Sequence, residues 1–160
     1  MEAKKEALPI LMVDDDRDDR LLTEKALRRN RVINPILFLQ DGEELMDYLQ
    51  RKGKFTAPGA APKPCFILLD LNMPRMDGRR ALEIIKADPD LRRIPVVILT
   101  TSQAEEDIVR SYNLGANSFI TKPVNFDNLV NLMESLKHYW LEIVELPSVD
   151  ESVRRAQNPI

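Results

Sequence analysis

The sequence has little cysteine, histidine or glycine: one, one and five residues in a chain of 160. The single Cys65 cannot form an internal disulfide and argues against a cysteine-based zinc site. The single His138 argues against a three-histidine metal site and a Ser-His-Asp triad. No glycines form a phosphate-binding loop such as G-x-x-x-x-G-K or G-x-G-x-x-G. Cysteine-zinc proteins, serine hydrolases and loop-type nucleotide-binding enzymes are therefore disfavoured.

Long apolar runs and an excess of positive charge are also missing. No apolar run approaches the roughly 18 residues of a membrane-spanning helix. The charged segment 1–7 lacks the pattern of a secretory signal. The 23 basic and 26 acidic residues give a net charge of −3, without the basic field that binding to a phosphate backbone needs. We expect a cytoplasmic protein with no direct nucleic-acid partner and no membrane partner.

Short apolar runs occur at intervals along the chain and predict strands. The first four are continuous, as in strands covered on both faces, and the fifth is inferred from its place in the series. The runs are Ile10–Val13, Ile36–Leu39, Phe66–Leu69, Val96–Leu99 and Ser118–Thr121.

Amphipathic stretches follow the runs and predict helices. Asp16 or Asp18 can cap the first helix, and the third must end before Pro89. The remaining signals are an Asp41–Gly42 turn, a capping box over 102–105, a stop near Gly115 and an apolar stripe over 129–143. Alternating strands and helices predict an α/β fold with a doubly wound parallel sheet.

We single out the polar residues that follow the first, third, fourth and fifth apolar runs. Because ligands of open parallel sheets bind beyond the carboxyl ends of the strands, these residues are the candidate site. They are Asp14, Asp15 and Asp16 after the first run, Asp70 after the third, Thr100 after the fourth and Lys122–Pro123 after the fifth.

Three neighbouring carboxylates repel one another unless a cation neutralises them. Mg²⁺ takes carboxylate, water and phosphate oxygens, so Asp14, Asp15 and Asp70 are candidate ligands. With the metal bound, a carboxylate can attack a phosphoryl donor and become an aspartyl phosphate. Asp70 stands alone after the central run and is the expected nucleophile, while Thr100 and Lys122 would bind the phosphoryl oxygens.

At these residues the sequence resembles a response-regulator receiver domain of two-component signalling. The resemblance rests on LMVDDD, LLDLNMPRMDG, VVILTTS and FITKP, and it covers residues 8–146, with 147–160 left as a C-terminal tail. It implies a flavodoxin-like, CheY-like fold with five parallel strands in the order 2-1-3-4-5 and five helices.

The resemblance also assigns roles to single residues. It implies that Asp70 is the phosphoacceptor and that Mg²⁺ binds Asp15 directly, Asp14 largely through water, and the backbone carbonyl of Asn72. Thr100 acts as a switch residue with Phe119, which has no hydroxyl and so can report only packing. The Lys122–Pro123 bond is expected to be cis.

A narrower resemblance rests on NPILFLQDGEEL, ADPDLRRIPVVILTTS and HYWLEIVELP. These segments are similar to the single-domain response regulators of bacterial phytochromes, the cyanobacterial ones among them. The implied phosphoryl donor is a phytochrome histidine kinase. Apolar residues at the end of the last helix favour a homodimer, and we expect signalling without a DNA-binding output domain.

Two other functions compete with the signalling hypothesis. A Mg²⁺-dependent phosphohydrolase would also form an aspartyl phosphate. Haloacid-dehalogenase-type enzymes carry a second acid two residues after the nucleophile, where this chain has Asn72, so continuous turnover is disfavoured. A binding module that takes no phosphate is the third possibility, and the complete set of acids, threonine and lysine argues against it.

Overall fold

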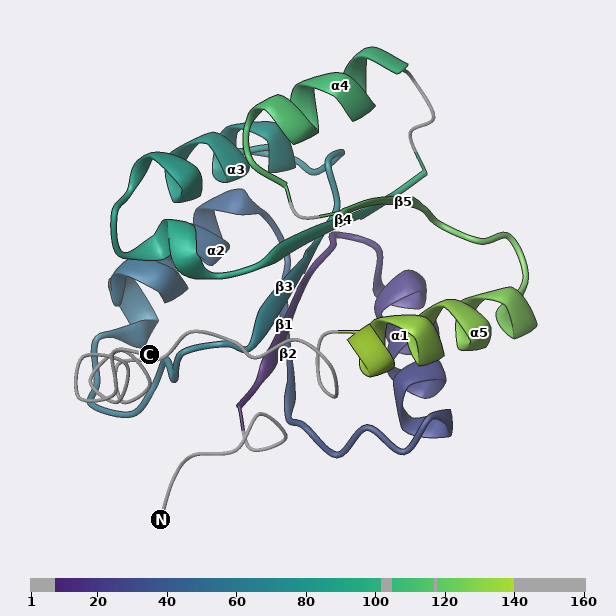
Figure 1. Ribbon diagram of the computed structural model, residues 1–160. Helices are drawn as coiled ribbons and strands as arrows, with labels where there is room; N and C mark the ends of the chain where they lie inside the picture. Colours follow the sequence, from purple (N-terminus) through teal and green to yellow (C-terminus); the bar gives the residue numbers. More distant parts are fainter. Residues whose placement is uncertain (1–7, 102–104, 117, 140–160) are drawn as a thin grey trace, which may run out of the picture.

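A parallel sheet lies at the centre of the computed structural model, which describes residues 8–101, 105–116 and 118–139 (Figure 1). Its strand order, β2-β1-β3-β4-β5, confirms the predicted topology. The strands are β1 (Ile10–Val13), β2 (Ile36–Leu39), β3 (Phe66–Leu69), β4 (Val96–Thr100) and β5 (Ser118–Thr121). Each apolar run therefore forms a strand, and β4 extends one residue further because Thr100 pairs with Thr121.

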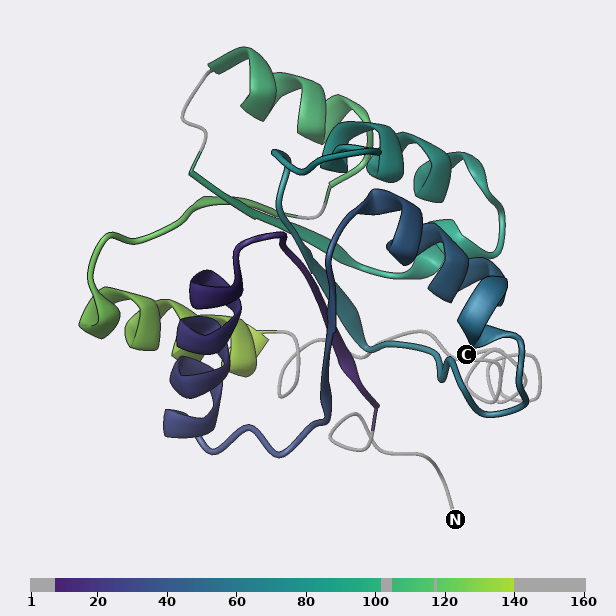
Figure 2. The ribbon, with the colours of Figure 1, turned by 180° about the vertical axis from the view of Figure 1, so that it is seen from behind.

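Helices cover both faces of the sheet. In Figures 1 and 2, α1 and α5 lie on one face, and α2, α3 and α4 lie on the other. The helices are α1 (Arg17–Arg29), α2 (Gly42–Gln50), α3 (Gly78–Ala87), α4 (Glu105–Asn113) and α5 (Phe126–Leu136), with short 3₁₀ turns η2 (Gly53–Phe55) and η3 (Leu91–Arg93). The predicted doubly wound α/β fold is confirmed.

Local sequence signals explain where the helices begin and end. Asp16, rather than Asp18, caps α1, since its carboxylate accepts hydrogen bonds from the backbone N–H groups of residues 18 and 19. Asp41 caps α2 in the same way. The third helix ends at Ala87, before Pro89, as the restricted conformation preceding proline requires.

Successive residues of each buried strand pack alternately into two hydrophobic cores, one on each face of the sheet. In β1, Leu11 and Val13 pack on the α2–α3 side, whereas Ile10 and Met12 pack on the α1–α5 side. All four are at most 2% exposed, so apolar residues at every position are explained by burial on both faces. The two cores fix the register of the sheet and the positions of its carboxyl ends.

Some predictions fall outside the described residues. These are the start of the capping box at 102–104, the part of the apolar stripe beyond residue 139, and the C-terminal tail at 147–160. Among the described residues, no helix has the length and apolar composition needed to cross a membrane.

Candidate functional site

Three carboxylates meet at the carboxyl edge of the sheet. The pairing of Val13 with Leu69 places the next residues, Asp14 and Asp70, side by side, and the Asp70 N–H donates to the Val13 carbonyl at 3.0 Å. One carboxylate oxygen each from Asp14, Asp15 and Asp70 lies within 4.8 Å of the others. Asp14 and Asp70 are buried and Asp15 is exposed, so the cluster is open to solvent on one side. This donor set fits a hard divalent cation.

Lys122 joins the carboxylates from the end of β5. Its backbone N–H donates to the Thr100 carbonyl at 2.7 Å, continuing the β4–β5 pairing. Its Nζ lies 2.6 Å from Asp14 Oδ2 and 3.4 Å from Asp70 Oδ2. The predicted convergence of Asp14, Asp70 and Lys122 on one edge is therefore present.

A fourth carboxylate was not predicted. Asp19 in α1 places Oδ2 2.7 Å from Lys122 Nζ, so one ammonium group serves three carboxylates. The only sequence signal for Asp19 is its place in the acidic first turn of α1, three residues after the N-cap Asp16.

Burial and charge shift the pKa values of this cluster. Burial raises the pKa of Asp14, and the hydrogen bond from Lys122 only partly offsets this effect. Burial alone would lower the pKa of Lys122, but its hydrogen bonds to Asp14 and Asp19 raise it above the usual value. Lys122 therefore stays charged. Its single positive charge cannot neutralise the three carboxylates that it contacts, those of Asp14, Asp19 and Asp70.

The oxygens of Asp14 and Asp70 are engaged to different degrees. Asp14 Oδ1 accepts the Asp16 N–H at 2.9 Å and Oδ2 accepts from Lys122 at 2.6 Å. Asp70 Oδ1 accepts the Asn72 N–H at 3.3 Å, and Oδ2 lies 3.4 Å from Lys122. Long, weak hydrogen bonds leave the Asp70 oxygens more available to an incoming electrophile.

The threonine and aromatic positions lie on the neighbouring strands. Thr100 is fully buried at the end of β4. Phe119 in β5 is partly buried against the core on the α2–α3 side, and its backbone N–H donates to the Tyr112 hydroxyl at 3.2 Å. This link from β5 to α4 was not predicted. The switch roles of Thr100 and Phe119 remain predictions.

The prediction of a cis peptide bond between Lys122 and Pro123 is wrong. Among the described residues the structure has no cis peptide, so this bond is trans. The trans form is favoured by about 0.5–1 kcal/mol in X-Pro bonds. With the trans bond, Lys122 already reaches Asp14 and Asp70, so the ion pairs do not require the other isomer.

A glycine allows α3 to begin directly against the phosphoacceptor candidate. A Cβ on Gly78 would lie 2.1 Å from the Asp70 carbonyl oxygen and 2.9 Å from the Leu71 Cα. The Gly78 N–H donates to the Leu71 carbonyl at 2.9 Å, which fixes this approach. The start of α3 is therefore packed on the backbone that carries Asp70.

We expect Gly78→Ala to destabilise the fold by about 1–3 kcal/mol, because the added methyl group must displace backbone rather than a flexible side chain. Urea unfolding followed by circular dichroism measures the change. Arg80→Ala, at an exposed position of the same helix, is the matched control and should change stability by less than about 0.5 kcal/mol. Equal stabilities of the two variants would contradict the close-approach argument.

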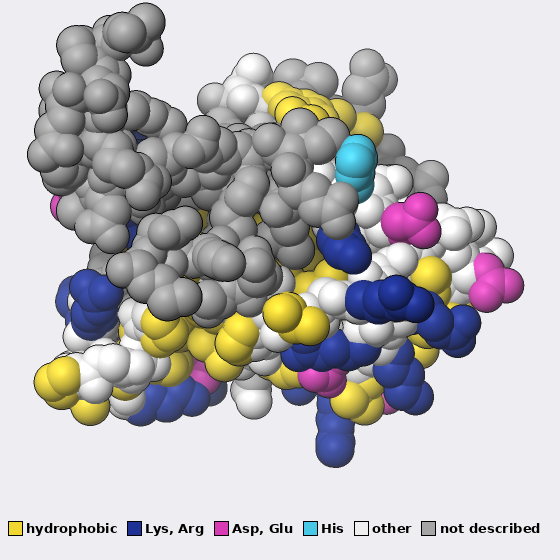
Figure 3. Space-filling model, turned by 60° about the horizontal axis from the view of Figure 1, so that its bottom comes forward, with side chains coloured by type: hydrophobic (Ala, Val, Ile, Leu, Met, Phe, Trp, Pro, Cys, Tyr) yellow, Lys and Arg dark blue, Asp and Glu magenta, His cyan; other side chains and the backbone are white. Residues whose placement is uncertain are grey.

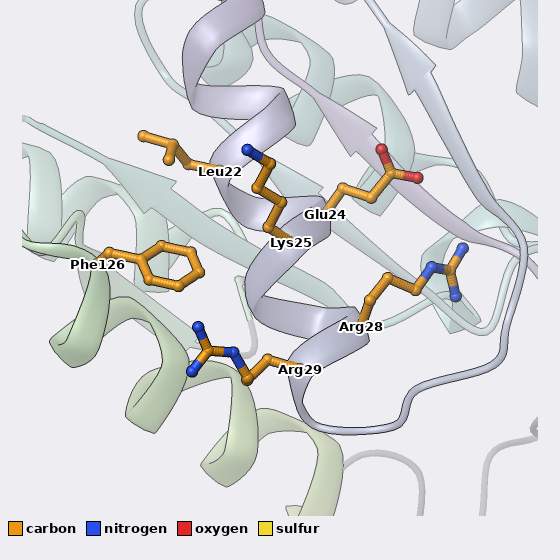
Figure 4. Close-up of a pocket in the computed structure, with 6 residues that line it drawn as sticks. All are labelled: Leu22, Glu24, Lys25, Arg28, Arg29 and Phe126. Atoms are coloured by element: carbon orange, nitrogen blue, oxygen red, sulfur yellow. The ribbon is translucent and has the colours of Figure 1, made fainter.

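Two hollows lie away from the acidic edge. One, of about 720 Å³ between α1 and α5, is lined by Leu22, Glu24, Lys25, Arg28, Arg29 and Phe126 (Figure 4). The Arg29 guanidinium lies 5.5 Å from the centre of the Phe126 ring. The other, of about 360 Å³, is lined by Arg29, Asn30, Arg31, Glu134, Lys137 and His138. Figure 3 shows several Lys and Arg side chains on the bottom face of the molecule, with a few Asp and Glu side chains among them.

Comparisons with known proteins place the site in context. The response regulator receiver domain family matches residues 10–134. Response regulator Rcp1 of Synechocystis sp. is 41% identical over 139 residues, which cover 87% of this chain and 92% of Rcp1. The Mn²⁺-bound form of Rcp1 matches with a TM-score of 0.80 and 40% identity over 88% of this chain and 99% of that chain. The phosphorylated cyanobacterial phytochrome response regulator RcpA matches with a TM-score of 0.82 and 41% identity over 89% and 99%. The matched residues include the whole acidic edge.

Proposed function

Because this chain belongs to the response regulator receiver domain family, we propose that it accepts a phosphoryl group on Asp70 from a sensor histidine kinase. It signals through the conformational change that follows. The observation that carries this proposal is the placement of Asp14, Asp15 and Lys122 around Asp70 at one solvent-accessible edge. The receiver domain spans residues 8–146, and 147–160 form the tail.

We assign the metal site to Mg²⁺, held by Asp14, Asp15, Asp70 and the backbone carbonyl of Asn72. The carboxylates have oxygen donors, mutual proximity and unmet negative charge, which suit a hard cation. When bound, the cation neutralises charge on the carboxylates and on the incoming phosphoryl group. The Mn²⁺-bound form of Rcp1 supports a divalent ion in this family.

The residues of the chain account for the rest of the transfer. An Asp70 carboxylate oxygen attacks the phosphorus of a phosphohistidine, a P–O bond forms, and the P–N bond breaks with the imidazole leaving. Lys122, already 3.4 Å from Asp70 Oδ2, pairs with the negative charge that the phosphoryl oxygens bring. Thr100, at the end of β4, supplies a hydroxyl donor to the same oxygens and acts as a switch together with Phe119.

The donor we propose is a phytochrome histidine kinase in the cytoplasm. RcpA is a cyanobacterial phytochrome response regulator, and its coverage of 89% of this chain supports a shared type of partner. The groove between α1 and α5, with apolar Leu22 and Phe126 beside Lys25 and Arg29, is a surface that a kinase helix can contact. Exposed Tyr112 in α4, Val124 before α5 and Tyr139 after it support a homodimer.

Incubation with acetyl phosphate and Mg²⁺ tests the proposal. We expect one added phosphoryl group per chain by intact-mass spectrometry, and none when EDTA removes the metal. A phosphohistidine on a purified phytochrome kinase should transfer to the protein at least as well. Sustained release of inorganic phosphate over many cycles would instead support the phosphohydrolase, and no added mass under any condition would support a binding module.

A further inference from the structure

Lys122 is held unevenly by its three carboxylate partners. Its Nζ lies 2.6 Å from Asp14 Oδ2 and 2.7 Å from Asp19 Oδ2, but 3.4 Å from Asp70 Oδ2. An ammonium group has three N–H donors, so these three contacts engage all of them. The two short contacts have the lengths of strong charge-assisted hydrogen bonds, and the third does not. Lys122 is therefore held mainly by Asp14 and Asp19 rather than by the phosphoacceptor candidate.

Asp14 and Asp19 differ in how easily each can release Lys122. The Asp14 side chain is only 2% exposed, so the loss of its cation would leave a buried carboxylate unpaired, which is costly. The Asp19 side chain, in the first turn of α1, is 35% exposed, so water can solvate its charge when Lys122 leaves. Of the two short contacts, the one with Asp19 is therefore the easier to break.

A phosphoryl group on Asp70 would change the balance among these partners. It brings more negative charge than a carboxylate and three oxygens that accept charge-assisted hydrogen bonds. Asp19 keeps a single negative charge that solvent partly screens. All three donors of Lys122 are already engaged, so a new short bond to a phosphoryl oxygen is made at the expense of an existing contact. The phosphoryl oxygens therefore compete with Asp19 for the same ammonium group.

We propose that Asp19 is a positioning residue that holds Lys122 in the unphosphorylated protein, and that a phosphoryl group on Asp70 displaces Asp19 from Lys122. By competing for this cation, Asp19 weakens binding of the phosphoryl group at Asp70. The exchange also breaks a direct link between α1 and the end of β5, two segments 103 residues apart in the sequence. The inference rests on the proposed function, because it takes Asp70 as the phosphoacceptor and Lys122 as the cation that pairs with the phosphoryl group.

Competition gives the proposal a measurable sign. If Asp19 and the phosphoryl group compete for Lys122, removing the Asp19 charge must strengthen binding of a phosphoryl mimic at Asp70. If Asp19 instead orients Lys122 toward the phosphoryl group, the same substitution must weaken binding. A general effect of negative charge predicts equal strengthening when a neighbouring acid is neutralised. Asp18 is such an acid, because it is exposed in the same turn of α1 and forms no ion pair with Lys122 in the part of the chain that the structure describes.

Isothermal titration calorimetry with beryllium fluoride, a phosphoryl mimic, tests this sign, with Mg²⁺ at a concentration that saturates each protein. We expect Asp19→Asn to tighten binding of the mimic about fivefold, the lower end of typical coupling between sites. The matched control Asp18→Asn should leave binding nearly unchanged. Unchanged or weaker binding in Asp19→Asn, or equal tightening in both variants, overturns the proposal. Failure of the wild-type protein to bind the mimic refutes the proposed function itself, and this inference with it.

NMR of the Lys122 ammonium group tests the contact and its displacement directly. The nitrogen resonance of this group is assigned by its loss in Lys122→Arg. Without metal or mimic, Asp19→Asn should shift the resonance and Asp18→Asn should not, because only Asp19 contacts Lys122. With Mg²⁺ and beryllium fluoride bound, the difference between wild type and Asp19→Asn should become much smaller. No shift in the unbound protein, or a difference that is undiminished in the bound protein, overturns the inference even if acetyl phosphate still modifies Asp70.

Discussion

Asp70→Asn is expected to abolish phosphoryl incorporation completely. The substitution keeps the shape of the side chain but removes the carboxylate nucleophile. Neighbouring acids should not replace it. Asp14 is 1% exposed and both its oxygens accept short hydrogen bonds, while Asp15 is exposed and makes no ion pair with Lys122 among the described contacts. Intact-mass spectrometry after incubation with acetyl phosphate and Mg²⁺ measures the loss.

The control for this experiment is Asp90→Asn, which changes an exposed aspartate far along the chain and should leave incorporation unchanged. Thermal unfolding separates chemistry from misfolding. Without metal, Asp70→Asn should be at least as stable as wild type, because it removes one of two buried like charges. Full incorporation in Asp70→Asn, or a phosphoryl group mapped to Asp14 in the wild-type protein, would refute the assignment of the nucleophile.

Lys122→Met should have the largest effect on stability. It leaves the buried carboxylates of Asp14 and Asp70 without their ammonium partner. Breaking a buried ion pair by removing one partner costs about 3–5 kcal/mol. For a chain of this size, that loss lowers the melting temperature by roughly 6–20 °C, measurable by calorimetry in the absence of divalent metal.

Two conditions should restore part of the stability of Lys122→Met. Added Mg²⁺ neutralises the same carboxylates, so it should raise the melting temperature of the variant more than that of wild type. Low pH should act in the same direction. Burial already raises the pKa of Asp14 above the value of 3.8 that applies when it is unfolded. The cost of its charge is therefore fully present above the raised pKa and is lost as pH falls toward 3.8.

The matched control is Lys54→Met, which removes a lysine that is 68% exposed and paired with Glu44. Exposed pairs contribute about 0–1 kcal/mol, so this variant should unfold close to wild type. If Lys122→Met were as stable as Lys54→Met without metal, the ammonium group would not be neutralising the acidic edge, and the electrostatic account of the site would be wrong.

The sequence patterns by themselves determined the strands, most helix boundaries and the doubly wound parallel sheet, while the strand order was implied by the resemblance to receiver domains. Continuous apolar runs such as Ile10–Val13 are readable because burial on both faces acts on each residue of the strand locally. Caps such as Asp16 and Asp41 are readable because they bond to backbone only two or three residues away. The order of acids, threonine and lysine after the strands then placed Asp14, Asp70 and Lys122 on one edge.

Only the tertiary structure decided which charges pair. Asp19 meets Lys122 across 103 residues of sequence, and Arg79 meets Asp107 across 28, with no periodic pattern linking either pair. Such pairings depend on how helices are rotated and packed on the sheet, which local signals do not encode. The trans Lys122–Pro123 bond is a similar case, because cis and trans differ by about 0.5–1 kcal/mol and the surrounding contacts select between them.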